Sequence, residues 1–191
     1  MGNITRSVGN LAQRMLFITR CNNALKLEGV KGKPMRKRII NQNTQNISPV
    51  DQSWIDLQHL AQVELTSEDA AHPIEAALIH SFGSGWRAAQ VGEQTIRFLF
   101  DEPQRIRRIQ LLFHEDQQAR TQEFILRWSP DAGQTFREIV RQQYNFSPPG
   151  MTREFEDYTV DLVGVMALEL RIVPDISGGD AHASVAQLRI A

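Results

Sequence analysis

The chain of 191 residues contains one cysteine, Cys21, and no long hydrophobic run. A single cysteine excludes an intramolecular disulfide framework and a metal site built from several cysteines. No apolar stretch approaches the ~18–20 residues that a helix needs to cross a bilayer. The apolar stretch 15–18 is also too short for the ~7–15-residue core of a secretion signal, and no lipobox surrounds Cys21. We therefore expect a cytoplasmic protein that does not enter a membrane.

Lysine is absent from residues 51–191, and this absence accompanies a sharp division of charge. Residues 1–50 contain nine Lys or Arg and one acid, whereas residues 51–191 contain 12 Arg and 21 acids. The two segments therefore carry +8 and −9, although the formal net charge of the whole chain is only −1. Such a break in composition marks a boundary. It predicts a basic, flexible N-terminal arm over 1–50 and a folded domain over 51–191.

The arm has few residues that could build a core. Its only aromatic residue is Phe17, and positions 41–46 form the polar tract Asn-Gln-Asn-Thr-Gln-Asn. A short amphipathic helix over 11–18 is the one element that its pattern suggests. The basic cluster 31–38 could contact the phosphates of a nucleic acid. Alternatively, translation could begin at Met35, in which case residues 1–34 are not native coding sequence.

From residue 60 onward, apolar and polar residues alternate in short stretches, which is the pattern of half-buried strands. Turn residues separate the stretches at 101–103, 129–133, 147–150 and 174–179, and a change of phase at Gln187 indicates a bulge. One helical turn is predicted over 73–78. Strands about ten residues apart without intervening helices predict an all-β, antiparallel sandwich or barrel. The apolar strand positions are Ile96, Phe98, Phe100, Ile109, Leu111, Phe113, Phe124, Leu126, Trp128, Tyr158, Val160, Leu162, Leu168, Leu170, Ile172, Val185, Leu188 and Ile190.

The order of these segments resembles the galactose-binding-like, or discoidin-type, β-sandwich family. That family includes bacterial carbohydrate-binding modules and the coagulation-factor C-terminal domains. The resemblance covers about residues 58–191. It begins with a first strand over 61–69 and a short helix over 72–78, and Gly85-Trp86-Arg87-Ala88 follows where the family has its tryptophan loop. The core strands 96–109, the hairpin 124–133 and the closing strand 183–189 then follow in the family's order, which implies a jelly-roll sandwich.

The resemblance also raises the question of a structural calcium ion. Many family members bind one near the tryptophan loop, with an Asp-Gly-Asp-type turn and an acid in the closing strand. Here the turn 79–85 reads Ile-His-Ser-Phe-Gly-Ser-Gly, and the closing strand carries Gln187. Calcium prefers several oxygen ligands, usually with carboxylates among them. We therefore expect no metal and no other cofactor, although backbone carbonyls could still contribute to a calcium site.

The sequence has no set of residues typical of an enzyme. The five histidines are scattered, without an HExxH motif or a closely spaced pair, and Cys21 lies in the arm. His114-Glu115-Asp116 could hold a metal or act in acid–base catalysis, but a polar loop explains it more simply. We therefore predict a protein that is not an enzyme.

Segment 129–136 fits the Asp-box pattern of sialidase-type propellers. A propeller would repeat the pattern in several blades, and this chain has one copy. The segment therefore predicts a hairpin turn in which Asp131 accepts backbone N–H bonds and Gly133 adopts a positive φ.

Three loops, 81–87, 114–120 and 142–150, the last followed by Arg153, carry the residue types that a polar ligand needs. The resemblance implies a ligand site on loops at one end of the sandwich. A sugar offers a C–H face to an aromatic ring and vicinal hydroxyls to planar polar groups. Binding residues gather on loops held by a rigid scaffold. The alternative is that Trp86 packs in the core while Tyr144 and Phe146 plug the end of the sandwich. The candidate ligand-binding residues are Trp86, Arg87, His114, Arg120, Tyr144, Asn145, Phe146 and Arg153.

These features together favour a non-catalytic binding domain of a bacterial protein, with a saccharide or a similar polar ligand. An intracellular protein-interaction or scaffold domain is the alternative. Nucleic-acid binding through the basic arm is a weaker alternative, because the domain itself is acidic. The sequence does not identify the ligand, the pathway or the oligomeric state.

Overall fold

The computed structural model describes residues 53–79 and 84–191. The predicted arm, with its basic cluster and its short helix, lies outside the described residues. Within the described part, no helix is long and apolar enough to cross a bilayer. The elements are α1 (Leu57–Leu60), β1 (Ala61–Leu65), α2 (Glu75–Leu78), β2 (Trp86–Val91), β3 (Gln94–His114), β4 (Arg120–Ser129), β5 (Arg137–Phe146), β6 (Arg153–Val173), β7 (His182–Val185) and β8 (Gln187–Ile190).

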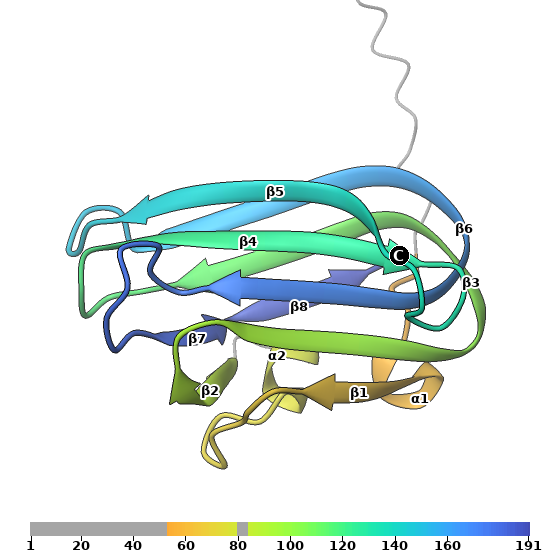
Figure 1. Ribbon diagram of the computed structural model, residues 1–191, viewed down its shortest axis with the longest axis horizontal. Coiled ribbons are helices and arrows are strands. Elements are labelled where there is room, and N and C mark those ends of the chain that lie inside the picture. Colours follow the sequence, from red (N-terminus) through yellow and green to blue (C-terminus); the bar gives the residue numbers. More distant parts are fainter. Residues whose placement is uncertain (1–52, 80–83) are drawn as a thin grey trace, which may run out of the picture. The chain divides into compact units, whose positions relative to one another are not determined.

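The strands pair in antiparallel fashion, which confirms the predicted fold class (Figure 1). α2 follows Pro73 and confirms the predicted helical turn. Pro73 precedes the N-cap residue Ile74, and its carbonyl oxygen accepts the backbone N–H of Ala76 at 3.0 Å.

β3 and β6, each of 21 residues, contribute to both layers of the sandwich (Figure 1). Residues 94–99 of β3 pair with 167–172 of β6, in a five-stranded layer of order β1-β3-β6-β4-β5. Residues 104–114 of β3 pair with 153–165 of β6, and β8 joins β3 on its other side. Register shifts between Leu99 and Arg108 mark the bend between the two halves. The two strands therefore bend together, and their hydrogen-bonded pairing continues from one layer into the other.

The turn predicted at 101–103 is wrong as a strand end, because these residues lie inside β3. Asp101, Glu102 and Pro103 are all exposed, as in a turn, but they form the bend while the strand continues. Gly164 serves the corresponding bend of β6 with a φ of +74°, which a residue with a Cβ adopts only under strain. Residues 142–146, expected in a loop, instead complete β5.

The predicted apolar rows meet between the two layers. Phe113 of β3 and Phe124 of β4 are buried, and their ring centroids lie 5.1 Å apart. Burying side chains of this size stabilises the fold by about 1.5–3 kcal/mol each. Some predicted core residues, Trp128, Tyr158, Val160 and Leu162, pack against the core but are only partly buried. The core therefore follows the sequence pattern most closely where β3, β4 and β6 cross the middle of the sandwich.

The β4–β5 connection confirms the predicted hairpin turn. Asp131 accepts the Thr135 backbone N–H at 2.8 Å and the Thr135 hydroxyl at 2.5 Å. Gly133 has a φ of +89°. The hydroxyl of Ser129 and the two groups of Thr135 lower the pKa of Asp131 to about 2. The segment that fits the Asp-box pattern is thus a self-contained turn at the end opposite to the loop 115–119.

The phase change at Gln187 divides the closing segment into two strands with different partners. β7 pairs with β2, whereas β8 pairs with β3. Between them, the backbone N–H of Ala186 donates to the carbonyl of Leu112 at 2.8 Å. This change of partner brings His182 and Ser184 next to β2, at the end of the sandwich where β3 finishes.

Candidate functional site

A cavity of about 300 Å³ lies at this end of the sandwich. It forms where the end of β3 and the loop 115–119 meet the paired strands β2 and β7. All nine lining residues are polar, so the cavity suits a hydrophilic ligand. They are Arg87, His114, Glu115, Asp116, Gln117, Gln118, Asp180, His182 and Ser184.

The β2–β7 pair positions one wall of the cavity. Arg87 lies directly opposite Ser184 in the register, and its backbone bonds to His72 and Asp69 hold it in place. His182 Nδ1 lies 2.9 Å from the carbonyl oxygen of Ala88. Because a carbonyl can only accept, Nδ1 carries a proton, and in the neutral ring the Nε2 lone pair can accept a hydrogen bond from a ligand hydroxyl.

Glu115 and Arg120 hold the opposite wall. One carboxylate oxygen of Glu115 accepts the backbone N–H groups of Gln117 and Gln118 at 2.8 and 3.2 Å, and the other accepts Arg120 Nε at 2.8 Å. Arg120 also donates to the carbonyl oxygen of Pro174 at 2.6 Å. Arg120 therefore ties the loop 115–119 to the chain that leads into β7.

The electrostatics of this pair follow from its burial. Burial alone would raise the pKa of Glu115, but the two amide hydrogen bonds and the charge of Arg120 outweigh it, so the pKa lies below its usual value. Burial lowers the pKa of Arg120, with Glu115 opposing the shift. A buried arginine remains ionised across the physiological range. Glu115 and Arg120 thus form a fixed, charged pair that supports one wall of the cavity.

The structure separates the candidate residues of the first two loops into three groups. Arg87 and His114 line the cavity. Arg120 is buried and supports the cavity only through the loop 115–119 that it holds. Trp86 is 1% exposed and belongs to the core, so its side chain offers no surface to a ligand. Residues 80–83, part of the predicted loop 81–87, lie outside the described residues.

The aromatic–amide cluster of β5 does not reach the cavity. Phe146 is buried against Arg120, and Tyr144 packs edge-on to it while donating its hydroxyl to the carbonyl of Arg153 at 3.0 Å. Asn145 accepts a hydrogen bond from Thr121 at 2.7 Å. Tyr144 and Phe146 therefore close the end of the sandwich. Arg153 is exposed and lies directly opposite His114 in the β3–β6 pairing.

Sequence reasoning did not select Asp180, His182 or Ser184 as ligand residues. The one local signal is Gly178-Gly179 before Asp180, both with a positive φ. Because these residues are about 70–100 positions from Arg87 and His114, only the pairing of β7 with β2 brings them together.

The turn 79–85, where the resemblance places a calcium ion, lies partly outside the described residues, so the expectation of no metal stays a prediction. Gln187 of the closing strand directs its amide Nε2, a donor, to the carbonyl oxygen of Ile79 at 3.4 Å. Among residues 53–79 and 84–191, no group of three or more His, Cys, Asp or Glu is arranged to hold a metal ion.

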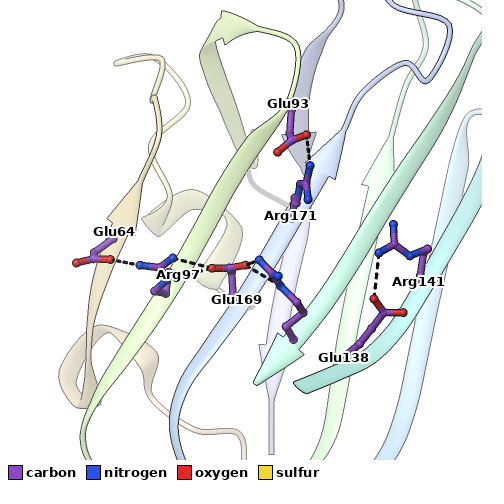
Figure 2. Close-up of polar contacts among 8 residues, drawn as sticks. Glu64, Glu93, Arg97, Glu138, Arg141, Glu169 and Arg171 are labelled. Atoms are coloured by element: carbon purple, nitrogen blue, oxygen red, sulfur yellow. Dashed lines mark hydrogen bonds and ion pairs between the residues drawn. The ribbon is translucent and has the colours of Figure 1, made fainter. Parts of the chain in front are cut away.

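The outer face of the five-stranded layer carries a second polar surface, which is filled by its own ion pairs (Figure 2). Arg97 donates to Glu64 at 3.0 Å and to Glu169 at 2.8 Å, and Arg127 also bonds to Glu169. Phe136 lies within 5.3 Å of both guanidinium groups. Because each of these charges already has a partner, this face is better explained as an ion-pair network that stabilises the sheet than as a ligand site.

No protein-family model matches the chain, and no curated protein gives a significant match. Several solved structures do match in fold. The family 32 carbohydrate-binding module of C. perfringens NanJ, in complex with galactose, has a TM-score of 0.54 at 10% identity, over 72% of this chain and 96% of that one.

Two other solved structures give the same result. CpGH89CBM32-5 from Clostridium perfringens, in complex with GalNAc-β-1,3-galactose, has a TM-score of 0.53 at 17% identity and covers 72% of this chain and 99% of that one. The F5/8 type C domain of a Bacteroides fragilis protein has a TM-score of 0.50 at 12% identity, with 72% and 94% covered. At such identities the likeness is one of fold, and it confirms the expected architecture. The chain has the galactose-binding-like, discoidin-type β-sandwich fold.

Proposed function

We propose that the chain is a non-catalytic module that binds a saccharide in the cavity at the loop end. The observation that carries this proposal is the convergence of Arg87, His114 and His182 on one polar cavity of about 300 Å³. Its size is at the lower end of small-ligand sites, which suits a single sugar ring. Support comes from the similar solved structures that hold galactose and GalNAc-β-1,3-galactose.

The lining chemistry matches that of a polyhydroxylated ring. A sugar hydroxyl both donates and accepts, so it needs partners of both kinds. The Arg87 guanidinium offers parallel donors to vicinal hydroxyls. The carboxylates of Asp116 and Asp180 and the Nε2 of His182 supply acceptors. The pair of Glu115 and Arg120 keeps the wall in place before the ligand arrives, which lowers the entropy lost on binding.

The test is calorimetric titration of the full chain with saccharides found on a glycan array. Arg87→Ala should weaken binding by roughly tenfold or more, since a hydrogen bond to a charged group contributes about 1.5–3 kcal/mol. Arg141→Ala is the matched control, because Arg141 is a half-exposed arginine on the outer face of β5. Absence of any saccharide binding, or equal binding by the two variants, would overturn the proposal.

The two alternative functions lack an equivalent observation. The basic cluster invoked for nucleic-acid binding lies outside the described residues. Large contiguous apolar patches often mark protein-interaction sites, and the exposed apolar side chains of the described part lie on several strands and loops.

A further inference from the structure

We infer that the binding surface extends from the cavity onto the outer face of the layer formed by β6, β3 and β8, where Phe155 forms a platform for a second sugar residue. This inference rests on the proposed function and specifies the length of saccharide that the site accepts.

Phe155 is the first reason for this inference. Its side chain is 58% exposed, and it is the only Phe, Tyr or Trp among residues 53–79 and 84–191 that is exposed rather than buried or partly buried. Its neighbour Glu154 is buried, so the pleat of β6 directs Phe155 to the opposite, outer face. An aromatic ring on the exposed face of a sheet is available to stack against a ligand.

The position of Phe155 relative to the cavity is the second reason. In the β3–β6 register, His114 lies opposite Arg153 and Leu112 lies opposite Phe155. Because Phe113 and Glu154 point inward, these four side chains share the outer face. His114, which lines the cavity, is therefore the diagonal neighbour of Phe155, at a Cα separation of ~7–8 Å. A ligand that leaves the cavity past His114 meets Phe155 next.

The chemistry around Phe155 favours a sugar over a protein partner. An aromatic ring takes the C–H face of a pyranose, and the exposed guanidinium of Arg153, between His114 and Phe155, can donate to its hydroxyls. On the far side, Asp157 is already bound to Arg108 at 2.6 Å and to Gln110 at 3.1 Å. The platform is thus one aromatic ring within a polar surround, whereas a protein interface usually has a larger apolar centre.

The test compares monosaccharides with disaccharides by calorimetry on the full chain. The pairs are galactose with GalNAc-β-1,3-galactose, glucose with cellobiose, and N-acetylglucosamine with its β-1,4-linked dimer. For a monosaccharide that binds, the disaccharide should bind roughly fivefold more tightly, in line with the energy of aromatic stacking. Phe155→Ala should abolish this gain and leave the affinity for the monosaccharide unchanged, and Phe155→Tyr should retain the gain.

Val163→Ala is the matched control, since Val163 is an apolar residue of the same strand that is 64% exposed near the opposite end of the sandwich. It should behave as wild type. A disaccharide that binds no more tightly than its monosaccharide, or a Phe155→Ala variant that weakens both equally, would overturn the inference while the saccharide-binding proposal stands. If no saccharide binds the wild-type chain, neither these sugars nor any on the glycan array, the inference fails together with the proposed function.

Discussion

Replacing Arg120 with methionine should destabilise the domain and weaken ligand binding together, because this one side chain ties two loops of the cavity. The arginine is buried, with Glu115 at 2.8 Å on one side and the carbonyl oxygen of Pro174 at 2.6 Å on the other. Methionine keeps the apolar contact with Phe146 and removes both hydrogen bonds.

The magnitude follows from these two bonds. Each hydrogen bond to a charged group contributes about 1.5–3 kcal/mol. Methionine also avoids the cost of burying a guanidinium, and Glu115 keeps its two amide donors. The free energy of unfolding should therefore fall by ~2–4 kcal/mol. For a domain of this size the corresponding fall in Tm is roughly 5–15 °C.

Urea denaturation at neutral pH measures this loss. Arg141→Ala is the control, because the ion pairs of Arg141 are exposed and should contribute no more than about 1 kcal/mol. The pKa of Glu115 is lowered in the folded state, so the stabilisation by the pair is complete above the ordinary value of 4.5 and is lost as the pH falls through the folded-state pKa. The difference between Arg120→Met and wild type should shrink in acid. A loss below about 1 kcal/mol at neutral pH, or a loss independent of pH, would refute the reasoning.

Three further predictions concern stability. Gly85→Ala should lower the free energy of unfolding by ~3 kcal/mol or more in denaturation experiments, because the new Cβ would lie 2.6 Å from the Val185 carbonyl oxygen. Gly92→Ala, which also has a positive φ but open space around it, should lower it by only ~1–2 kcal/mol. Burial, and after it the neighbouring Glu156, raise the pKa of Glu154 to about 8. Between about pH 5 and 8 the folded chain therefore keeps a proton that the unfolded chain releases, so Tm should fall as the pH rises through this range. Glu154→Gln should flatten this fall. Glu169→Ala should lower the free energy of unfolding by ~2–3 kcal/mol, because it leaves Arg127 without an ion-pair partner and Arg97 with Glu64 alone, and a smaller loss for Glu169→Gln would support the hydrogen-bonding role.

Local patterns in the sequence predicted much of the fold. The alternation around Phe98, Leu111 and Phe124 identified buried strand faces, because side chains on a strand point to opposite sides in turn. Asp131 and Gly133 predicted a turn that depends only on neighbouring residues. The bend of β3 at 101–103 was misread as a strand end, because a bend inside a paired strand and a turn between strands use the same exposed residues.

The candidate site was predicted only in part, for a similar reason. The fold resemblance indicated loops at one end of the sandwich, and Arg87 and His114 do line the cavity found there. Trp86 and Phe146, the aromatic residues expected to contact a ligand, are both buried. Composition cannot tell which side of a strand end faces solvent.

By itself, the sequence determined the all-β class, the apolar faces of the strands and the division of charge at residue 50, since each depends on periodicity or composition within a short stretch. The tertiary structure decided the rest. The pairing of β7 with β2 brought His182 to Arg87, and the register of β3 with β6 set Arg153 and Phe155 beside His114. Both depend on hydrogen bonds between strands distant in the chain, whose partners no local pattern specifies.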